Sequence, residues 1–432
     1  MRASRFPCRH ALAPGLLFAL GLFVWLGGTG LAREASEGWL QWGGPTHDFH
    51  APGSGLAADW GGEGPPVLWS RELGEGYSSV LFEDGRLYTL YRAAEREVVA
   101  CLDSRHGHTV WEHAYASRPQ PGHVDEHGRG PRATPLLAGE RLFTIGVAGI
   151  LHAFDKHTGR LLWSRDLWGP ELGGNLLLHG YSSSPIAYRD WVIVLVGGKE
   201  ASIVALRQSD GSIVWKAQSF ENSYSTPQLL EVDGELQLVA LMAADVVGLN
   251  PDNGELAWSY PVANHFAQNI TMPTLVDGRY LFVSAYQVGS VGLKLTRQAD
   301  GSTAVEKIWS TLKIQLYHAT TVRDGDWVYG STGLRAPAFL AAVNVKSGEI
   351  GWRERGFSKA NCVMADGKLF ILDEDGTLAM ATATPQGLTV LASAQVLGGV
   401  SYTPPTLVGG TLFVRGGDRL KALDLGGRRA SR

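Results

Sequence analysis

Short hydrophobic runs separated by polar turns recur along most of the chain. Residues 86–90 (RLYTL), 191–196 (WVIVLV) and 368–372 (KLFIL) are typical of these runs, and their aromatic and β-branched side chains favour strands. Eight turn signals accompany the runs: Asp84-Gly85, Gly139-Glu140, Arg189-Asp190, Asp233-Gly234, Asp277-Gly278, Asp324-Gly325, Asp366-Gly367 and Gly409-Gly410. Five of the eight are Asp-Gly, a dipeptide that tolerates the positive φ angles of two-residue hairpins. The pattern predicts eight β-hairpins.

A second pattern follows the hairpins: an apolar residue, four variable residues, Gly, three variable residues and then Trp. Clear copies end at Trp111, Trp163, Trp215, Trp258 and Trp352, and a looser copy with extra residues runs from Gly301 to Trp309. Repetition at a period of roughly 40 to 50 residues is typical of solenoids, propellers and arrays. Together with the hairpins it indicates four strands per repeat, which predicts the blades of a β-propeller.

The two ends of the repeat region complement each other. Trp69 has no Gly phrase before it, whereas Ala422-Leu423-Asp424 begins a phrase that never reaches a Trp. We therefore expect the N-terminal strand around Trp69 to complete the C-terminal blade and close the ring, which leaves no open sheet edge between the two ends. The predicted fold is an all-β, eight-bladed propeller of four-stranded blades. The tryptophans expected to pack between blades are Trp69, Trp111, Trp163, Trp215, Trp258, Trp309 and Trp352, with Leu391 in the same place in the seventh blade.

The N-terminus has the order of an export signal. Arg2, Arg5 and Arg9 precede an apolar stretch at residues 11–28, and small residues follow up to Ala32. This segment is either cleaved after Ala32 or kept as a membrane anchor, and in both cases we expect the protein in the periplasm or outside the cell. The predicted division is a signal peptide or anchor at 1–32, a Gly-, Pro- and Trp-rich arm at 33–65, the propeller at 66–426 and a tail at 427–432.

Charge and cysteine content exclude some classes of protein. The 432 residues carry a formal net charge of −4, so no basic surface argues for nucleic acid as a partner. After the export segment only Cys101 and Cys362 remain, which rules out a disulfide framework. The two cysteines can pair or stay buried as small apolar residues, and the sequence does not decide between these.

The repeats resemble a known family. Residues 153–163 (AFDKHTGRLLW) match the tryptophan-docking motif of proteins with pyrroloquinoline-quinone-like (PQQ-like) repeats, and residues 39–45 (WLQWGGP) resemble the lead segment of its extracytoplasmic members. Other copies depart from the motif, because Arg207, Asn250 and Asn344 replace its Asp. The resemblance covers nearly all of the chain after the export segment and implies the propeller fold.

The family contains two classes of protein. One class consists of quinoprotein dehydrogenases, which hold the quinone and Ca²⁺ over the propeller axis, often with a disulfide between adjacent cysteines. The other is a non-catalytic branch that includes the propeller lipoprotein of the Bam complex. This chain has no adjacent cysteine pair and no carboxylates at a spacing that matches the calcium ligands. We therefore expect a binding or scaffold protein without bound cofactor or catalytic residues, and keep a PQQ- and calcium-dependent alcohol or sugar dehydrogenase as the alternative.

One loop contains residues that can bind a metal. His123, Asp125 and His127 lie in the run GHVDEHG, and imidazole and carboxylate groups are common metal ligands. Pro119, Pro121, Gly128 and Pro131 flank this run and indicate an exposed loop, in which polar residues need no metal. We expect no metal site here, and His123, Asp125 and His127 remain a weak alternative.

The segments that open the first strand of the blades provide the main candidate site. Polar and aromatic residues recur there, and the candidates for a ligand-binding channel rim are Tyr77, Arg132, Tyr181, Tyr224, His318 and Tyr402. A funnel with tyrosines, a guanidinium and an imidazole suits a peptide or a small ligand. In the opposing interpretation the Ser/Thr-Pro turns only start strands, and tyrosines fill the narrow axis. The expected partner is an envelope or extracellular protein, with a small ligand or glycan also possible, no nucleic acid, and membrane contact only through an uncleaved anchor.

Overall fold

A computed structural model describes residues 38–53, 55–119, 124, 126, 128–263, 268–333 and 337–426. In this part of the chain, 32 strands form eight four-stranded antiparallel sheets, and no α-helix occurs. Accordingly, the described residues contain no helix with the length and apolar character needed to cross a membrane. The predicted export segment at 1–32 and the tail at 427–432 lie outside the described residues.

The first four blades follow each other along the chain. Blade 1 contains β2 (Leu81–Glu83), β3 (Arg86–Ala93), β4 (Arg96–Asp103) and β5 (Thr109–Ala116). Blade 2 contains β6 (Leu136–Ala138), β7 (Arg141–Ile145), β8 (Ile150–Asp155) and β9 (Leu161–Asp166). Blade 3 contains β10 (Ile186–Tyr188), β11 (Trp191–Gly198), β12 (Ala201–Arg207) and β13 (Ile213–Ala217). Blade 4 contains β14 (Gln228–Val232), β15 (Glu235–Leu241), β16 (Asp245–Leu249) and β17 (Leu256–Pro261).

The last four blades continue in the same order. Blade 5 contains β18 (Thr274–Val276), β19 (Tyr280–Ala285), β20 (Gly289–Arg297) and β21 (Thr303–Thr311). Blade 6 contains β22 (Val322–Asp324), β23 (Trp327–Ser331), β24 (Phe339–Asn344) and β25 (Ile350–Arg355). Blade 7 contains β26 (Asn361–Ala365), β27 (Lys368–Leu372), β28 (Thr377–Thr384) and β29 (Gly387–Gln395). Blade 8 contains β30 (Thr406–Val408), β31 (Thr411–Gly416), β32 (Arg419–Asp424) and β1 (Val67–Glu72).

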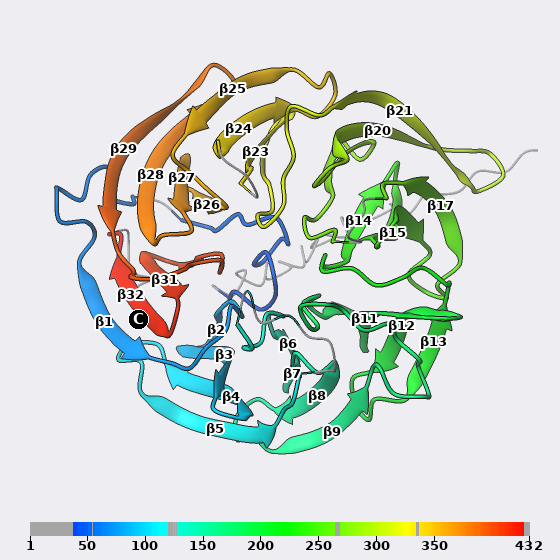
Figure 1. Cartoon of the computed structure of the whole chain (residues 1–432), viewed down its shortest axis with the longest axis horizontal. Coiled ribbons are helices and arrows are strands. Elements are labelled where there is room, and N and C mark those ends of the chain that lie inside the picture. Colours follow the sequence, from blue (N-terminus) through cyan, green and yellow to red (C-terminus); the bar gives the residue numbers. More distant parts are fainter. Residues whose placement is uncertain are drawn as a thin grey trace, which may run out of the picture. The chain divides into compact units, whose positions relative to one another are not determined.

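The ring closes between the two ends of the repeat region, as predicted. β1 pairs antiparallel with β32, and Trp69 lies opposite Ala422. Figure 1 shows this joint as the blue β1 beside the red β32 at the outer edge of the last blade. Because the N-terminal strand supplies the fourth strand of blade 8, the two ends of the repeat region are held together by backbone hydrogen bonds within one sheet.

Most of the predicted hairpin turns lie where the sequence placed them. At Asp84-Gly85, for example, both central residues of the turn have positive φ, 48° at Asp84 and 74° at Gly85. The sixth turn is shifted by one residue from the prediction, because Asp324 pairs with Trp327.

Each outer strand has a β-bulge immediately before the Trp position. In blade 7 this register places Ala392, opposite Met380, in that position, so the assignment of Leu391 was wrong by one residue.

The repeated Gly and Trp belong to contacts between neighbouring blades. Trp163 of blade 2 donates its indole N–H to the carbonyl of Gln208 in blade 3 at 3.0 Å, and its ring lies against Gly211. Trp69, Trp111, Trp215 and Trp309 dock on the next blade in the same way, with Nε1 to carbonyl distances of 2.9, 3.0, 3.1 and 2.7 Å. The glycine that follows in each of these five cases receives the Trp of the preceding blade, which is why the two residues recur together.

Trp258 departs from this arrangement. Its Nε1 donates to the Gln237 Oε1 of its own blade at 2.7 Å. The glycine expected to receive it, Gly301, has open space where a Cβ would lie. The longer hairpin between β20 and β21 carries that glycine away from the blade interface, which explains why the fifth copy of the motif is irregular.

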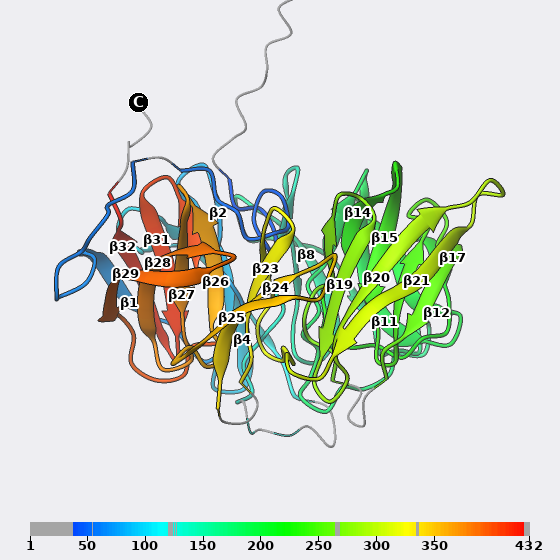
Figure 2. The same ribbon diagram turned by 90° about the horizontal axis from the view of Figure 1, so that it is seen from above.

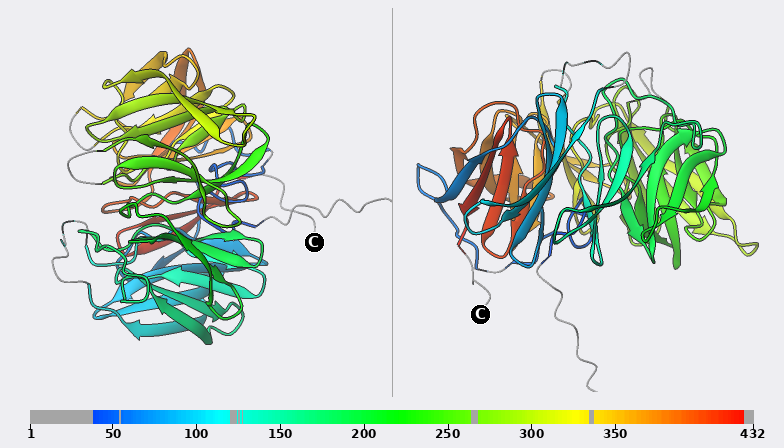
Figure 3. Two further views of the ribbon diagram at one scale, coloured as in Figure 1. Left: turned by 90° about the vertical axis from the view of Figure 1, so that its right-hand side faces the viewer. Right: turned by 90° about the horizontal axis from the view of Figure 1, so that it is seen from below.

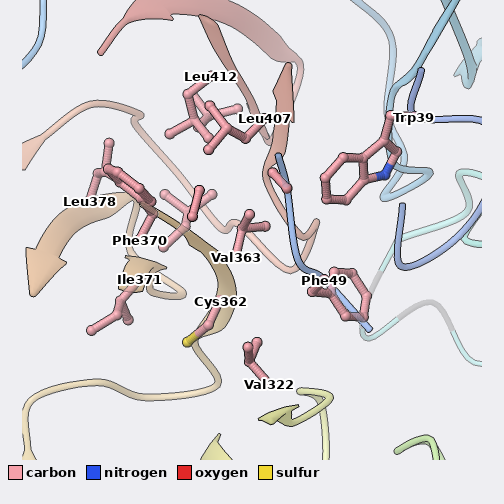
Figure 4. Packing of buried hydrophobic residues seen from close by; sticks show 14 of the residues in the cluster. Trp39, Phe49, Val322, Cys362, Val363, Phe370, Ile371, Leu378, Leu407 and Leu412 are labelled. Carbon is pink, nitrogen blue, oxygen red and sulfur yellow. The ribbon is translucent and has the colours of Figure 1, made fainter. Parts of the chain in front are cut away.

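The arm crosses the face of the ring that carries the hairpin turns. Trp39 forms a bridge with Phe82 of β2, His50 with Met364 of β26, and Leu56 with Gly426. Figures 2 and 3 show this blue segment along one face of the ring. The Trp39 and Phe49 side chains are 1% and 2% exposed in a hydrophobic cluster that also contains blade 7 residues, and Figure 4 shows both rings there. The aromatic residues of the arm therefore anchor it to the propeller.

The two remaining cysteines are not bonded to each other. Cys101 lies in blade 1 and Cys362 in blade 7, and both thiols are free and buried. Burial raises the pKa of Cys101 to about 11 and that of Cys362 to about 12. Both side chains are therefore protonated and apolar in character at neutral pH, as expected for cysteines that act as core residues.

Candidate functional site

The segments that lead into the first strands converge on one cavity in the channel. It is a small cavity of about 120 Å³, below the roughly 300–1,000 Å³ of most ligand pockets. Its lining residues are Trp42, Tyr77, Arg132, His179, Ser182, Ser184, Tyr224, Thr226, Gln268, Ile270, Tyr317, His318, Thr320 and Tyr402. They come from the arm and from seven inter-blade segments, so almost the whole ring contributes to one site.

A belt of hydroxyl groups holds these segments together beneath the rim. The Thr134 hydroxyl accepts the Ser79 N–H at 3.0 Å, and the Ser184 hydroxyl accepts the Thr134 N–H at 3.0 Å. The Thr226 hydroxyl then accepts the Ser184 N–H at 3.1 Å. Each bond joins one blade to the next and satisfies a buried backbone donor. The Ser and Thr residues of the recurring motif therefore have a structural role, and the residue two positions before each of them faces the channel.

Five of the six predicted rim residues line the cavity. These are Tyr77, Arg132, Tyr224, His318 and Tyr402. Tyr181 does not: it is fully buried, donates its O–H to the Leu195 carbonyl at 2.7 Å, and packs against Trp168. Its placement at the rim was therefore wrong, and Ser182 lines the cavity in its place.

The spacing to the strand explains this error and reveals two residues that were missed. Arg132 and Tyr224 stand three residues before the prolines that precede β6 and β14. Tyr181 stands four residues before Pro185, so it faces the other way, while Ser182 and Ile270 have the correct spacing. Counting back three residues from the proline is the signal that identifies the channel-facing position, because successive residues of an extended segment point in opposite directions.

Trp42 of the arm is a lining residue that the repeat pattern did not predict. Its indole N–H points to the Met272 sulfur at 3.0 Å, and its ring meets Phe49 edge-on at 5.3 Å between centroids. The adjoining Leu40 accepts the Leu137 N–H at 2.8 Å on the hairpin face. The arm therefore carries Trp42 to the channel from the hairpin face. We call the opposite face, which carries the loops that lead into the first strands, the mouth face.

Arg132 and His179 are polar residues of the wall with separate hydrogen bonds. Arg132 donates to the Gly128 carbonyl at 2.8 Å. The His179 ring lies 3.3 Å from the Gln268 amide nitrogen, and the Tyr224 hydroxyl accepts the backbone N–H of His179 at 3.3 Å. Burial lowers the pKa of His179, with the charge of Arg132 acting in the same direction, so the imidazole is neutral at pH 7. Among the described lining residues, Arg132 carries a permanent charge.

Aromatic rings form the opposite wall. His318 stacks on Tyr402 at 4.9 Å between ring centroids, and Tyr77 lies 5.4 Å from Tyr402. Lys359 donates to the Tyr402 hydroxyl at 3.2 Å and forms an ion pair with Glu374 at 2.7 Å. The cation is thus neutralised beside the wall, which presents mainly apolar ring surface to the cavity.

The cavity does not fit a calcium-bound quinone. Calcium takes six to eight oxygen ligands, with carboxylates among them. Among the described residues that line the cavity there is no Asp or Glu. The chemistry of the wall is therefore aromatic and cationic, and we derive no redox step through a quinone. The weak metal candidates His123, Asp125 and His127 lie outside the described residues.

Asp373, near the mouth face, provides a prediction for the pH dependence of stability. Burial raises the pKa of this carboxyl from 3.8 to about 7. Between pH 3.8 and about pH 7, Asp373 keeps its proton in the folded protein but has released it in the unfolded chain. The free energy of unfolding therefore falls as pH rises through this range and levels off above about pH 7. We expect the free energy of unfolding to fall by about 1–2 kcal/mol more in the native protein than in Asp373→Asn between pH 5 and pH 8. Denaturant unfolding at both pH values measures this, and equal changes would contradict it.

The sequence is similar to proteins of two kinds. The family model of the outer membrane protein assembly factor BamB matches residues 94–354. BamB from Yersinia pestis is 22% identical over 65% of this chain and 70% of its own length. The quinoprotein alcohol dehydrogenase PedH from Pseudomonas putida is 28% identical, over 35% of this chain and 25% of its own length.

Solved structures show the same fold. BamB from Moraxella catarrhalis superposes with a TM-score of 0.55 at 19% identity, covering 83% of this chain and 99% of that chain. Quinohemoprotein alcohol dehydrogenase from Comamonas testosteroni gives a TM-score of 0.64 at 13% identity, covering 93% of this chain and 82% of that chain. Both classes thus share the propeller, and residues at the site have to separate them.

Proposed function

Because the chain belongs to the family of the outer membrane protein assembly factor BamB, we propose that it is a non-catalytic scaffold that binds an envelope protein. The contact surface is the mouth face, made of the loops that lead into the first strands and the rim of the channel. The absence of carboxylates among the described lining residues supports a scaffold without a quinone rather than a calcium-dependent dehydrogenase.

Exposed leucines beside the cavity are the observation that carries this proposal. Leu176 and Leu178, in the loop before β10, are 52% and 49% exposed. Leu312 and Val400 lie in the loops before β22 and β30 and are 68% and 44% exposed, but they line other hollows than this cavity. Leu176 and Leu178 lie next to the lining residue His179, and neighbouring exposed apolar side chains beside a cavity favour a protein contact. The same face carries the loops that lead to the lining residues, so loops and rim form a single surface.

The proposal includes export. The N-terminal order of basic, apolar and small residues directs the chain out of the cytoplasm, and relatives named as outer membrane assembly factors support an envelope location. We propose residues 1–32 as the export segment or anchor, 33–65 as the arm, 66–426 as the propeller and 427–432 as the tail.

Leucine substitutions on the mouth face test the proposed contact. We expect Leu176→Asp combined with Leu178→Asp to reduce capture of the partner from envelope extract about tenfold, because a buried charge removes apolar contact and adds a desolvation cost. Quantitative mass spectrometry of captured proteins measures the loss relative to the native chain.

Leu256→Asp is the matched control, because Leu256 is 43% exposed on the outer strand β17, away from the mouth face. It should leave capture unchanged. If the mouth-face variant and the control capture the same proteins in the same amounts, the mouth face is not the contact surface.

A further inference from the structure

We propose that the arm is a clasp that supplies the docking contact missing from blade 7 and thereby holds blade 7 to blade 8. Ala57 and Trp60 of the arm take the two roles that one outer-strand Trp has at most other joints, a hydrogen bond to the next blade and a ring packed on an aromatic residue. The clasp concerns the closure of the ring and does not depend on the proposed protein contact.

Blade 7 lacks the Trp that docks on the next blade. In blade 2, Trp163 lies opposite Ala153 and Ala153 lies opposite Phe143, so the indole crosses a small residue and meets an aromatic ring at 5.8 Å between centroids. The corresponding row of blade 7 is Ala392, Met380 and Phe370. A small residue replaces the Trp and a large one replaces the small residue, so Phe370 receives no indole from its own outer strand.

The arm donates to the carbonyl that would otherwise accept an indole N–H. In blade 1 this acceptor is Ser104, the residue that follows β4. Leu425 follows β32 and holds the same position in blade 8, and the N–H groups of both residues bond their own hairpin turns, at Gly85 and Gly410. The Ala57 N–H donates to the Leu425 carbonyl at 2.7 Å. A backbone group of the arm thus takes the place of an indole N–H.

The arm also covers the aromatic ring of blade 7. Trp60 stacks on Phe370 with 6.3 Å between ring centroids and 22° between planes. This distance is close to the 5.8–6.2 Å that separate the docking tryptophans of blades 1, 2, 5, 6 and 8 from the aromatic residues of their own blades. Trp60 packs on a hydrophobic cluster that contains Leu378 of blade 7 and Leu407 of blade 8. Its indole N–H is buried without a partner among the described residues, and Ala57 already bonds the expected acceptor.

The clasp is continuous with the strand that completes blade 8. Gly64 lies so close to β29 that a Cβ at this residue would be 2.6 Å from the Cβ of Ala394. The Asp424 N–H donates to the Pro66 carbonyl at 2.8 Å, and β1 begins at the next residue. One continuous segment therefore joins blade 7 to blade 8 and then supplies the fourth strand of blade 8.

Double-mutant cycles on the full chain test the stacked pair. Trp60→Leu and Phe370→Leu should each raise the equilibrium constant of unfolding about tenfold or more, as the loss of a packed ring does. The double variant should fall short of the product of the two effects by about threefold to tenfold, because either substitution alone already removes the pair. Trp60→Leu with Phe143→Leu is the matched control, since Trp163 covers that ring, and it should give the full product. Full products in both cycles would overturn the proposal.

A transferred tryptophan tests whether Trp60 replaces the missing residue. Met380→Ala together with Ala392→Trp gives blade 7 the row found in blade 2. In the Trp60→Leu background this pair of substitutions should lower the unfolding constant about tenfold, because the new indole covers the Phe370 ring that Trp60 has left. In the native background the same pair should give no gain, since Trp60 already covers that ring. An equal effect in both backgrounds would overturn the proposal, and the double-mutant cycles decide it if the transferred variant does not fold.

Hydrogen exchange shows whether Trp60 holds the arm itself. In Trp60→Leu, the amides of residues 55–66, including the bonded Ala57 N–H, should exchange about tenfold faster or more, because the arm opens without unfolding of the ring. The amides of residues 205–217, at the joint between blades 2 and 3, should keep their native rates. Unchanged exchange at 55–66 would show that Trp60 does not hold the arm and would contradict the clasp.

Discussion

Replacing Arg415 with methionine should lower the free energy of unfolding by about 3 kcal/mol or more. Arg415 of β31 is 1% exposed, and its guanidinium donates to the carbonyls of Ser78 and Leu90 at 2.8 and 2.7 Å and to the Thr89 hydroxyl at 3.0 Å. Burial lowers its pKa to about 10, so it remains charged at neutral pH. Methionine fills much of the volume but removes the charged donor from these buried acceptors, of which the Ser78 carbonyl keeps the Thr89 hydroxyl at 3.3 Å. A buried acceptor left without a donor costs about 1–3 kcal/mol.

The control for Arg415 lies on the neighbouring strand. Arg419 pairs with Glu72 between β32 and β1 of blade 8 at 2.8 Å, but that glutamate is 72% exposed. Arg419→Met should therefore change stability by less than about 1 kcal/mol, as surface ion pairs do. Denaturant unfolding measures the loss of stability in Arg415→Met and in Arg419→Met. If the losses are similar, Arg415 does not hold the first and last blades together.

Substituting alanine for Gly211 should destabilise the propeller by about 3 kcal/mol. Gly211 has a φ of +70°, and a Cβ there would lie 2.6 Å from the Trp163 ring. The loss combines about 1–2 kcal/mol for a left-handed residue other than glycine with about 1–3 kcal/mol for overpacking at the tryptophan. Denaturant midpoints at constant m value measure the change.

Gly301 is the matched control for this docking contact. Its φ of +87° is similar, but no atom lies within 4 Å of the position of its Cβ. Gly301→Ala should therefore cost only the conformational part, about 1–2 kcal/mol. In a Trp163→Leu background, the overpacking at the tryptophan is absent, so the loss of stability from Gly211→Ala should approach that from Gly301→Ala. Equal losses at Gly211 and Gly301 in the native background would show that docking of the tryptophan does not make the glycine necessary.

Much of the fold could be predicted because its information is local. An Asp-Gly turn is read from two adjacent residues, and a blade from four strands within one repeat. Even the long-range joint between β1 and β32 was predictable, since Trp69 and the segment at Ala422 each carry half of one motif. The error at Leu391 arose because blade 7 has no Trp, and only the bulge shows that Ala392 occupies that register.

The candidate site was predictable where it follows the repeat. Arg132, Tyr224 and Tyr402 occupy the channel-facing position, and a motif aligned on the strand start finds them. Tyr181 was misplaced because residue type was used instead of spacing, and a shift of one residue in an extended segment reverses the direction of the side chain. The binding role of this rim stays a proposal.

The sequence alone determined the number of blades, their four-stranded form and the closure of the ring, since repeated local patterns carry that information in every copy. The tertiary structure decided what a single copy cannot contain. Trp42 lines the channel cavity because the arm folds back across the hairpin face, and Arg415 of β31 joins blade 8 to carbonyls of blade 1. Neither contact is part of the repeated motif, so both depend on which surfaces the closed ring brings together, and that is a property of packing rather than of pattern.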